Sequence, residues 1–166
     1  MLEKYAMSRT LITYGTFDMF HIGHLRLLER MRELGKRVVV GVSTDEFNVL
    51  KGKHALVPYV ERQAIVAALK YVDLVIAEGS WQQKAADIQQ YGVDCLVMGD
   101  DWTGRFDHLR EFCEVLYLPR TPGVSSTELR ELLMRMNLGE GAIHGVMKQM
   151  VRLLQDQPAI MPARED

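Results

Sequence analysis

Two histidines stand three residues apart in the segment His21-Ile22-Gly23-His24, shortly after Tyr14-Gly15-Thr16-Phe17-Asp18. An apolar run precedes them and a helical pattern follows them, which predicts a strand, a turn and then a helix. The first turn of a helix offers unpaired N–H groups and the positive end of its dipole to an anion. Because residues three apart share one helix face, we expect His21 and His24 to hold a phosphate beside the Gly23 backbone.

Imidazole suits such a site in either protonation state, because it titrates near about pH 6.5. The two rings would donate hydrogen bonds to phosphate oxygens and stabilise the negative charge on a pentavalent α-phosphorus. They need not carry protons to do so.

A second anion-binding segment is expected over residues 120–127. Arg120 offers a bidentate phosphate donor, and Gly123 allows close approach of the backbone. The start of the following helix carries three hydroxyl groups, those of Ser125, Ser126 and Thr127. A capping box of Ser125 with Glu128 would explain this helix start but not the arginine.

Basic residues also follow the second predicted strand. Lys51 and Lys53 lie in a stretch with little helical pattern, which we interpret as a loop that closes over a substrate. A solvated basic turn is the alternative. Arg62, at the start of the next helix, could reach the same phosphates or lie on the surface.

Acidic and aromatic side chains accompany these cations. Asp18 could hold a magnesium ion that bridges phosphate oxygens, or it could orient a histidine or the turn. Asp101 directly follows a predicted strand, where its carboxylate could recognise a ribose or a base. Trp81 and Trp102 could belong to the core or form a pocket wall.

The elements that must position these residues alternate between strands and helices. Near-continuous apolar runs predict strands at 11–15, 38–42, 72–77, 94–98 and 114–118, and helical patterns fall at 23–34, 59–70, 80–91 and 105–112. This alternation predicts a single doubly wound, Rossmann-like α/β domain with a five-stranded parallel sheet. The candidate residues then meet at the carboxyl edge of the sheet, where such folds bind ligands.

Boundary signals divide the chain into a lead-in at 1–10, a domain at 11–136, and a helical extension with a tail at 137–166. We expect capping boxes at Ser43 with Glu46 and at Ser80 with Gln83. Gly35 and Gly92 are expected to end helices.

Met7 could serve as an alternative start. The helix expected at 139–155 carries an apolar stripe that could dock on its own domain, on a subunit or partner, or on a membrane surface.

Composition narrows the function classes. The chain has 166 residues, a net charge of -2 and a pI near 6.2, which give no bulk attraction to nucleic acid. Its apolar runs are too short to span a bilayer, and we expect no secretion signal. The two cysteines, Cys95 and Cys113, lack metal-ligand spacing. We therefore expect a cytoplasmic protein with reduced thiols.

Taken together, the segments 14–18, 21–24 and 120–127 resemble the two signature motifs of the cytidylyltransferases, and the resemblance covers about residues 11–133. The segments 43–48, 71–73, 98–102 and 117–121 are similar to those of the members that act on glycerol 3-phosphate. The HxGH pattern alone is shared with adenylyltransferases and class I aminoacyl-tRNA synthetases.

The resemblance implies a homodimer that transfers CMP from CTP to sn-glycerol 3-phosphate, with a divalent ion such as Mg²⁺, and a product that feeds a cell-envelope polymer. It implies catalytic roles for His21, His24, Lys51 and Arg120. It implies nucleotide contacts from Thr16, Phe17, Gly23, His24, Lys53, Asp101, Arg120, Ser125, Ser126 and Thr127. It implies acceptor contacts from Lys51, Arg62, Lys70, Asp73 and Trp81.

Two positions depart from the family pattern. Lys70 stands where these enzymes carry arginine, so charge is kept while the bidentate fork is lost. Ser126 replaces the more usual threonine and keeps a hydroxyl. The alternatives are another alcohol or polyol phosphate as acceptor, adenylyl transfer from ATP, and a non-catalytic nucleotide sensor. A choline-type acceptor would need an aromatic cage, for which the sequence shows no clear cluster.

Overall fold

The computed structural model describes residues 8–123, 125–135, 141, 144–145 and 148. Its centre is a sheet of five parallel strands in the order β3-β2-β1-β4-β5. The strands are β1 (Thr10–Gly15), β2 (Arg37–Ser43), β3 (Leu74–Glu78), β4 (Cys95–Gly99) and β5 (Glu114–Leu118). The order reverses between β1 and β4, which confirms the doubly wound fold and places the switch point beside β1.

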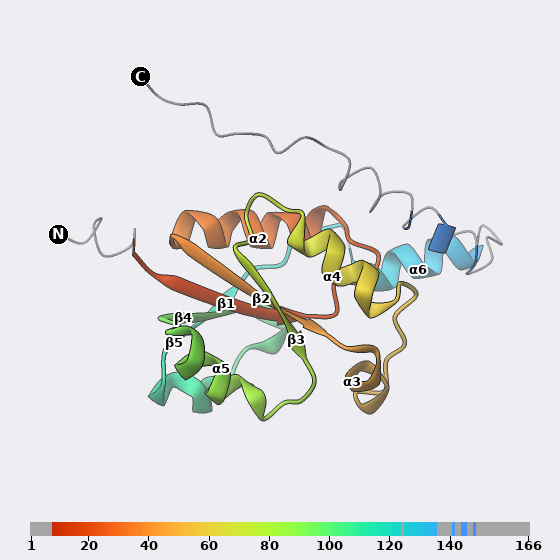
Figure 1. Cartoon of the computed structure of the whole chain (residues 1–166). Helices are drawn as coiled ribbons and strands as arrows, with labels where there is room; N and C mark the ends of the chain where they lie inside the picture. The colour runs from red at the N-terminus through yellow and green to blue at the C-terminus, as the bar shows by residue number, and fades with distance from the viewer. Residues whose placement is uncertain (1–7, 124, 136–140, 142–143, 146–147, 149–166) are drawn as a thin grey trace, which may run out of the picture.

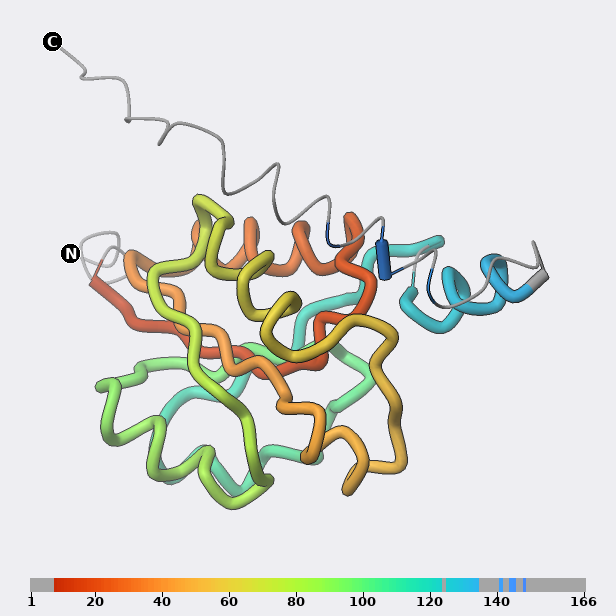
Figure 2. Tube along the Cα trace, turned by 45° about the vertical axis from the view of Figure 1, so that its right-hand side comes forward, coloured from red at the N-terminus to blue at the C-terminus, as the bar shows by residue number. Residues whose placement is uncertain are grey.

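Five α-helices accompany the sheet in the described part of the chain: α2 (Ile22–Leu34), α3 (Asp45–Leu50), α4 (Tyr59–Ala67), α5 (Gln83–Tyr91) and α6 (Ser126–Arg135). Helices α2 and α4 cover one face and α5 covers the other, while α3 and α6 lie beyond the carboxyl edge (Figures 1 and 2). Both faces of the sheet are therefore buried. Leu11 packs into one core cluster and its neighbour Ile12 into the other, which explains why the strands are apolar almost throughout.

Several elements differ from the sequence-based expectation. Residues 105–112 do not form an α-helix; two 3₁₀ turns, η1 (Asp100–Trp102) and η2 (Asp107–Glu111), flank Gly104, whose φ of +81° is unfavourable in a helix. Helix α4 ends at Ala67, and β3 begins at Leu74 rather than at residue 72.

The helix-start signals are also partly revised. Thr44 caps α3 through the backbone N–H of Phe47, whereas Ser43 is the last residue of β2 and is fully buried. The reciprocal hydrogen bonds between Ser80 and Gln83 are present. Gly92 ends α5 in the left-handed conformation, as expected.

The expected lead-in and the helix at 139–155 lie almost entirely outside the described residues. In the tail, the described His144 places its Nε2 3.3 Å from Oε1 of Glu61 in α4. No helix among the described residues is long and apolar enough to cross a bilayer.

Candidate active site

Two adjoining pockets open at the carboxyl edge of the sheet. The histidine pocket, of about 320 Å³, lies beside the start of α2 and the β5–α6 loop. The aromatic pocket, of about 530 Å³, lies toward β3 and the α3–α4 loop. Both pockets are lined by Phe17, His24, Lys53, Asp101 and Trp102, so His24 lies at their junction.

The structure brings most of the predicted site residues to these pockets. The histidine pocket is lined by Thr16, Phe17, His21, Gly23, His24, Lys53, Asp101, Arg120, Ser125, Ser126 and Thr127. The aromatic pocket adds Asp18, Lys51 and Trp81. Arg62, Lys70 and Asp73 line neither pocket.

The histidine pair is also the cap of α2. His21 is the N-cap residue, and its Nδ1 accepts the backbone N–H of Gly23 at 3.1 Å. Nδ1 of His24 accepts the backbone N–H of His21 at 3.4 Å. The two rings stack with centroids 3.8 Å apart. A capping box made from two histidines thus fixes the orientation of both rings at the start of α2.

This geometry decides where each ring carries its proton. Because each Nδ1 accepts a hydrogen bond, a neutral ring must bear its hydrogen on Nε2. Burial, the neighbouring His21 and the Arg120 guanidinium lower the pKa of His24 to about 3. Burial and Arg120 also lower the pKa of His21. Both rings are therefore neutral hydrogen-bond donors at pH 7, which matches their expected role toward phosphate oxygens.

The two donors differ in what they already contact. Nε2 of His21 lies 3.3 Å from Oγ of Ser126, which donates to the backbone carbonyl of Asp18 at 2.9 Å. Nε2 of His24 makes no hydrogen bond within the described part of the chain, and His24 lines both pockets. His24 is thus the ring whose donor is ready for a ligand.

Asp18 organises the surrounding loops instead of fitting a metal ion. Its buried carboxylate accepts the backbone N–H groups of Met19, Leu56 and Val57, and it pairs with Arg130 of α6 at 3.0 Å. Four donors occupy the two oxygens, so the magnesium role expected for Asp18 does not fit. Among the described residues, no group of three or more His, Cys, Asp or Glu side chains could hold a metal ion.

The same turn stores backbone strain. Phe17 and Met19 have φ values of 52° and 46°, a backbone conformation that residues other than glycine rarely adopt. The bonds to the Asp18 carboxylate hold this conformation and connect it to both the α3–α4 loop and α6. Arg130, which the sequence reading did not single out, completes this connection through His54 O at 2.7 Å.

Arg62 is neither a surface residue nor a pocket residue. Its side chain is fully buried and donates to the carbonyls of Val57, Thr16 and Ser43 and to the carboxylate of Asp45. The guanidinium thereby ties together the β1, β2 and α4 segments beneath the site. We correct the expected acceptor contact to a positioning role, because these partners hold Arg62 below the pocket floor.

Lys51 belongs to a buried charge cluster that sequence reasoning missed. Its Nζ donates to Oγ of Ser43 at 2.7 Å and lies 3.6 Å from Glu78. Glu78 also pairs with Lys84 of α5 and accepts the hydroxyl of Ser43. Burial lowers the pKa of both lysines, and Glu78 opposes this shift. A glutamate directly after an apolar strand was the available signal for this cluster.

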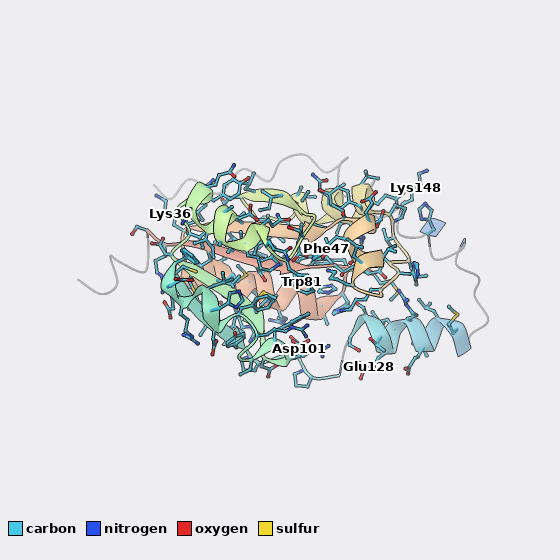
Figure 3. All side chains as sticks on the ribbon, turned by 90° about the horizontal axis from the view of Figure 1, so that it is seen from below. Lys36, Phe47, Trp81, Asp101, Glu128 and Lys148 are labelled. Carbon is cyan, nitrogen blue, oxygen red and sulfur yellow. The ribbon has the colours of Figure 1, made fainter. Side chains whose placement is uncertain are left out.

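The aromatic pocket is named for rings that the sequence did not show as a cluster. Phe47 and Trp81 lie beside each other in Figure 3, with ring centroids 5.3 Å apart. Trp81 also packs against Trp102 at 5.9 Å and Phe106 at 6.4 Å. Both tryptophans therefore form a pocket wall.

Lys70 and Asp73 lie at the opposite edge of the sheet. Both precede β3, so they sit where that strand begins, whereas the pockets lie where the strands end. Asp73 accepts hydrogen bonds from Arg32 at 2.6 Å and from the backbone of Val38 at 2.7 Å. The acceptor contacts expected of these two residues are thus not formed with the pockets of the same chain.

Comparisons with known proteins agree with this site. The chain matches the model of the family described as Cytidylyltransferase-like over residues 12–132. It is 52% identical over 123 residues to the glycerol-3-phosphate cytidylyltransferase of Bacillus subtilis (strain 168), covering 74% of this chain and 95% of the relative.

More distant relatives share parts of this likeness. An ethanolamine-phosphate cytidylyltransferase of Arabidopsis thaliana is 33% identical over 127 residues, covering 69% of this chain and 30% of that protein. The crystal structure of a lipopolysaccharide core biosynthesis protein from Thermoplasma volcanium shares the fold, with a TM-score of 0.58 at 22% identity over 68% of this chain and 98% of that one. The chain therefore belongs to the cytidylyltransferase-like family.

Proposed function

We propose that the protein transfers CMP from CTP to sn-glycerol 3-phosphate, giving CDP-glycerol and pyrophosphate. The observation that carries the reaction type is the neutral Nε2–H of His24 at the junction of the two pockets. The CMP phosphorus that passes from one substrate to the other must lie where their two pockets meet, and His24 lines both pockets. The named activity of the Bacillus subtilis relative, which aligns over 95% of its length, supports the two substrates.

In this reaction a phosphate oxygen of the acceptor attacks the α-phosphorus of CTP, and the bond to the β-phosphate oxygen breaks. Pyrophosphate leaves in line, so the protein forms no covalent intermediate and acts by positioning and electrostatics. His24 donates to the α-phosphate as its charge grows. His21 and the N-terminus of α2 support the same group.

The nucleotide fits the histidine pocket, because that pocket lies at the switch point between β1 and β4. The Arg120 side chain is 54% exposed, with Asp101 at 3.9 Å, so it is available to phosphate oxygens. Ser125 and Thr127 at the start of α6 add hydroxyl donors, while the Ser126 hydroxyl already donates to the carbonyl of Asp18. Lys51 and Lys53 then face the acceptor phosphate from the aromatic pocket.

Three further properties complete the proposal. A divalent ion such as Mg²⁺ would accompany the triphosphate and offset its negative charge. The protein acts as a homodimer in the cytoplasm, where CTP is available. Lys70 and Asp73 contribute to an acceptor site only if a second copy brings them there.

The test is to incubate the purified protein with CTP or ATP and with glycerol 3-phosphate, ethanolamine phosphate or another polyol phosphate. We expect much faster pyrophosphate release with CTP and glycerol 3-phosphate, giving CDP-glycerol, than with any other pair of substrates, and a requirement for a divalent ion. Turnover with ATP but not CTP would contradict the proposal. Sedimentation of the same preparation measures the oligomeric state.

A further inference from the structure

Lys84 of α5 is a buried cation that the proposed reaction does not use. Its side chain is 2% exposed, and its ammonium pairs with Glu78. The Nζ lies 4.2 Å from the ring centroid of Tyr14, 5.0 Å from that of Trp81 and 5.6 Å from that of Phe106. Three aromatic rings and one carboxylate therefore surround a single ammonium group.

This arrangement has the composition of a site that recognises an ammonium ligand. The three rings and Glu78 line the aromatic pocket, whereas Lys84 does not. The lysine thus reaches the rings from the core of the protein, and its own charge fills the place that a cationic ligand would take.

The Trp81 ring is likewise already in contact with cations of the protein. Besides Lys84, Nζ of Lys51 lies 5.7 Å from its ring and the Arg105 guanidinium carbon also lies 5.7 Å from it. Three cations from three separate segments therefore share one indole. The Glu78 carboxylate is occupied as well, by Lys84 on one oxygen and by Ser43 and Lys51 on the other.

We propose that Lys84 is the specificity-determining residue that excludes cationic alcohol phosphates, such as ethanolamine phosphate, and selects an uncharged polyol phosphate. This inference rests on the proposed function and deepens it. An acceptor whose phosphate contacts Lys51 brings its alcohol end against Trp81, because these two side chains lie together. An ammonium at that end would meet the positive charge of Lys84 and rings that are already occupied, whereas hydroxyl groups meet no such repulsion.

The test is the ratio of kcat/KM for ethanolamine phosphate to kcat/KM for glycerol 3-phosphate, with CTP in excess. Lys84→Met keeps most of the side-chain volume and removes the charge. Lys84→Arg is the matched control that keeps the charge. We expect the ratio to rise by about tenfold or more in Lys84→Met, the size of one vacated cation–π contact, and not to rise in Lys84→Arg. Changes in Lys51 or in CTP binding alter both acceptors and cancel in the ratio.

Each outcome separates this inference from the proposed function. A wild-type protein that makes no CDP-glycerol would refute the proposed function itself. If the wild type makes CDP-glycerol but the ratio stays unchanged in Lys84→Met, or rises equally in Lys84→Arg, the selectivity role of Lys84 is refuted. Should Lys84→Met not fold, the double variant Glu78→Gln with Lys84→Met removes both buried charges together and is subject to the same criterion.

Discussion

The two nitrogens of His24 have separate tasks, which two substitutions can distinguish. Nδ1 closes the capping box with the backbone N–H of His21, and Nε2 has no hydrogen-bond partner among the described residues, although His24 lines both pockets. In His24→Asn the side-chain oxygen replaces Nδ1 while no group reaches the position of Nε2. In His24→Gln the longer amide reaches the position of Nε2 and the cap is lost. Both variants lose the ring contacts with Phe17 and Phe20, so a comparison between them cancels that loss.

The two contacts differ in the size of the effect expected when each is removed. A donor to developing transition-state charge contributes about 3–4 kcal/mol, so His24→Asn should lower kcat by about 10²–10³. The cap contributes about 1 kcal/mol, so His24→Gln should have the lower free energy of unfolding by about that amount. We also expect His24→Gln to keep at least about tenfold more activity than His24→Asn, because its amide can donate in place of Nε2.

Pyrophosphate release at saturating CTP and glycerol 3-phosphate measures the first effect, and urea unfolding measures the second. Near-normal kcat in a folded His24→Asn protein would refute the assignment of Nε2 as the phosphate donor. Equal activities of the two variants would show that the ring acts through packing rather than through this nitrogen.

Three other predictions test the same site. Asp18→Asn should lower the free energy of unfolding, measured in urea, by about 2–4 kcal/mol, because the new amide N–H₂ would face the N–H donors of Leu56 and Arg130. The Mg²⁺ dependence of CTP binding should stay unchanged. A normal stability with a weakened Mg²⁺ dependence would make Asp18 a metal ligand. Burial lowers the pKa of His24 from its ordinary 6.5, the value of the unfolded chain, to about 3 in the folded chain, so between these two pH values only the unfolded chain binds the proton. The free energy of unfolding should therefore fall by about 2 kcal/mol from pH 7 to pH 5, and His24→Asn should abolish this part of the slope. Lys70→Ala should leave the KM for glycerol 3-phosphate unchanged, and a large rise in this KM would indicate that a second copy supplies Lys70 to the acceptor site.

Periodicity and topology rules predicted the five-stranded parallel sheet and the rim of candidate residues because the central strands are buried on both faces. The same rules could not predict the 3₁₀ turns around Gly104, since a short polar segment fits several local conformations. The placement of Lys70 and Asp73 was predictable in principle. Both precede a strand of a parallel sheet, and the residues that precede such strands gather at the edge away from the ligand.

The buried polar groups were harder to predict. Histidine is not a usual N-cap residue, so the spacing of His21 and His24 indicated phosphate binding but not their mutual capping. Glu78 and Lys84 come from β3 and α5, and only the pairing of β2 with β3 brings Glu78 beside Ser43. Sequence periodicity contains no information on such contacts between elements.

Hydrogen-bond partners separate the ligand-facing residues from those that hold the site in place. Arg62 and Asp18 had residue types suited to phosphate and metal, yet their polar atoms are occupied by loop and strand partners. The side chains of Lys53 and Arg120 and Nε2 of His24 make no hydrogen bond within the described residues, and all three residues line the pockets. Because a buried polar atom must be satisfied by the protein, while a ligand-binding atom must remain available, residue type alone cannot distinguish the two. The chemistry of this site therefore follows from the donors that folding leaves unpaired.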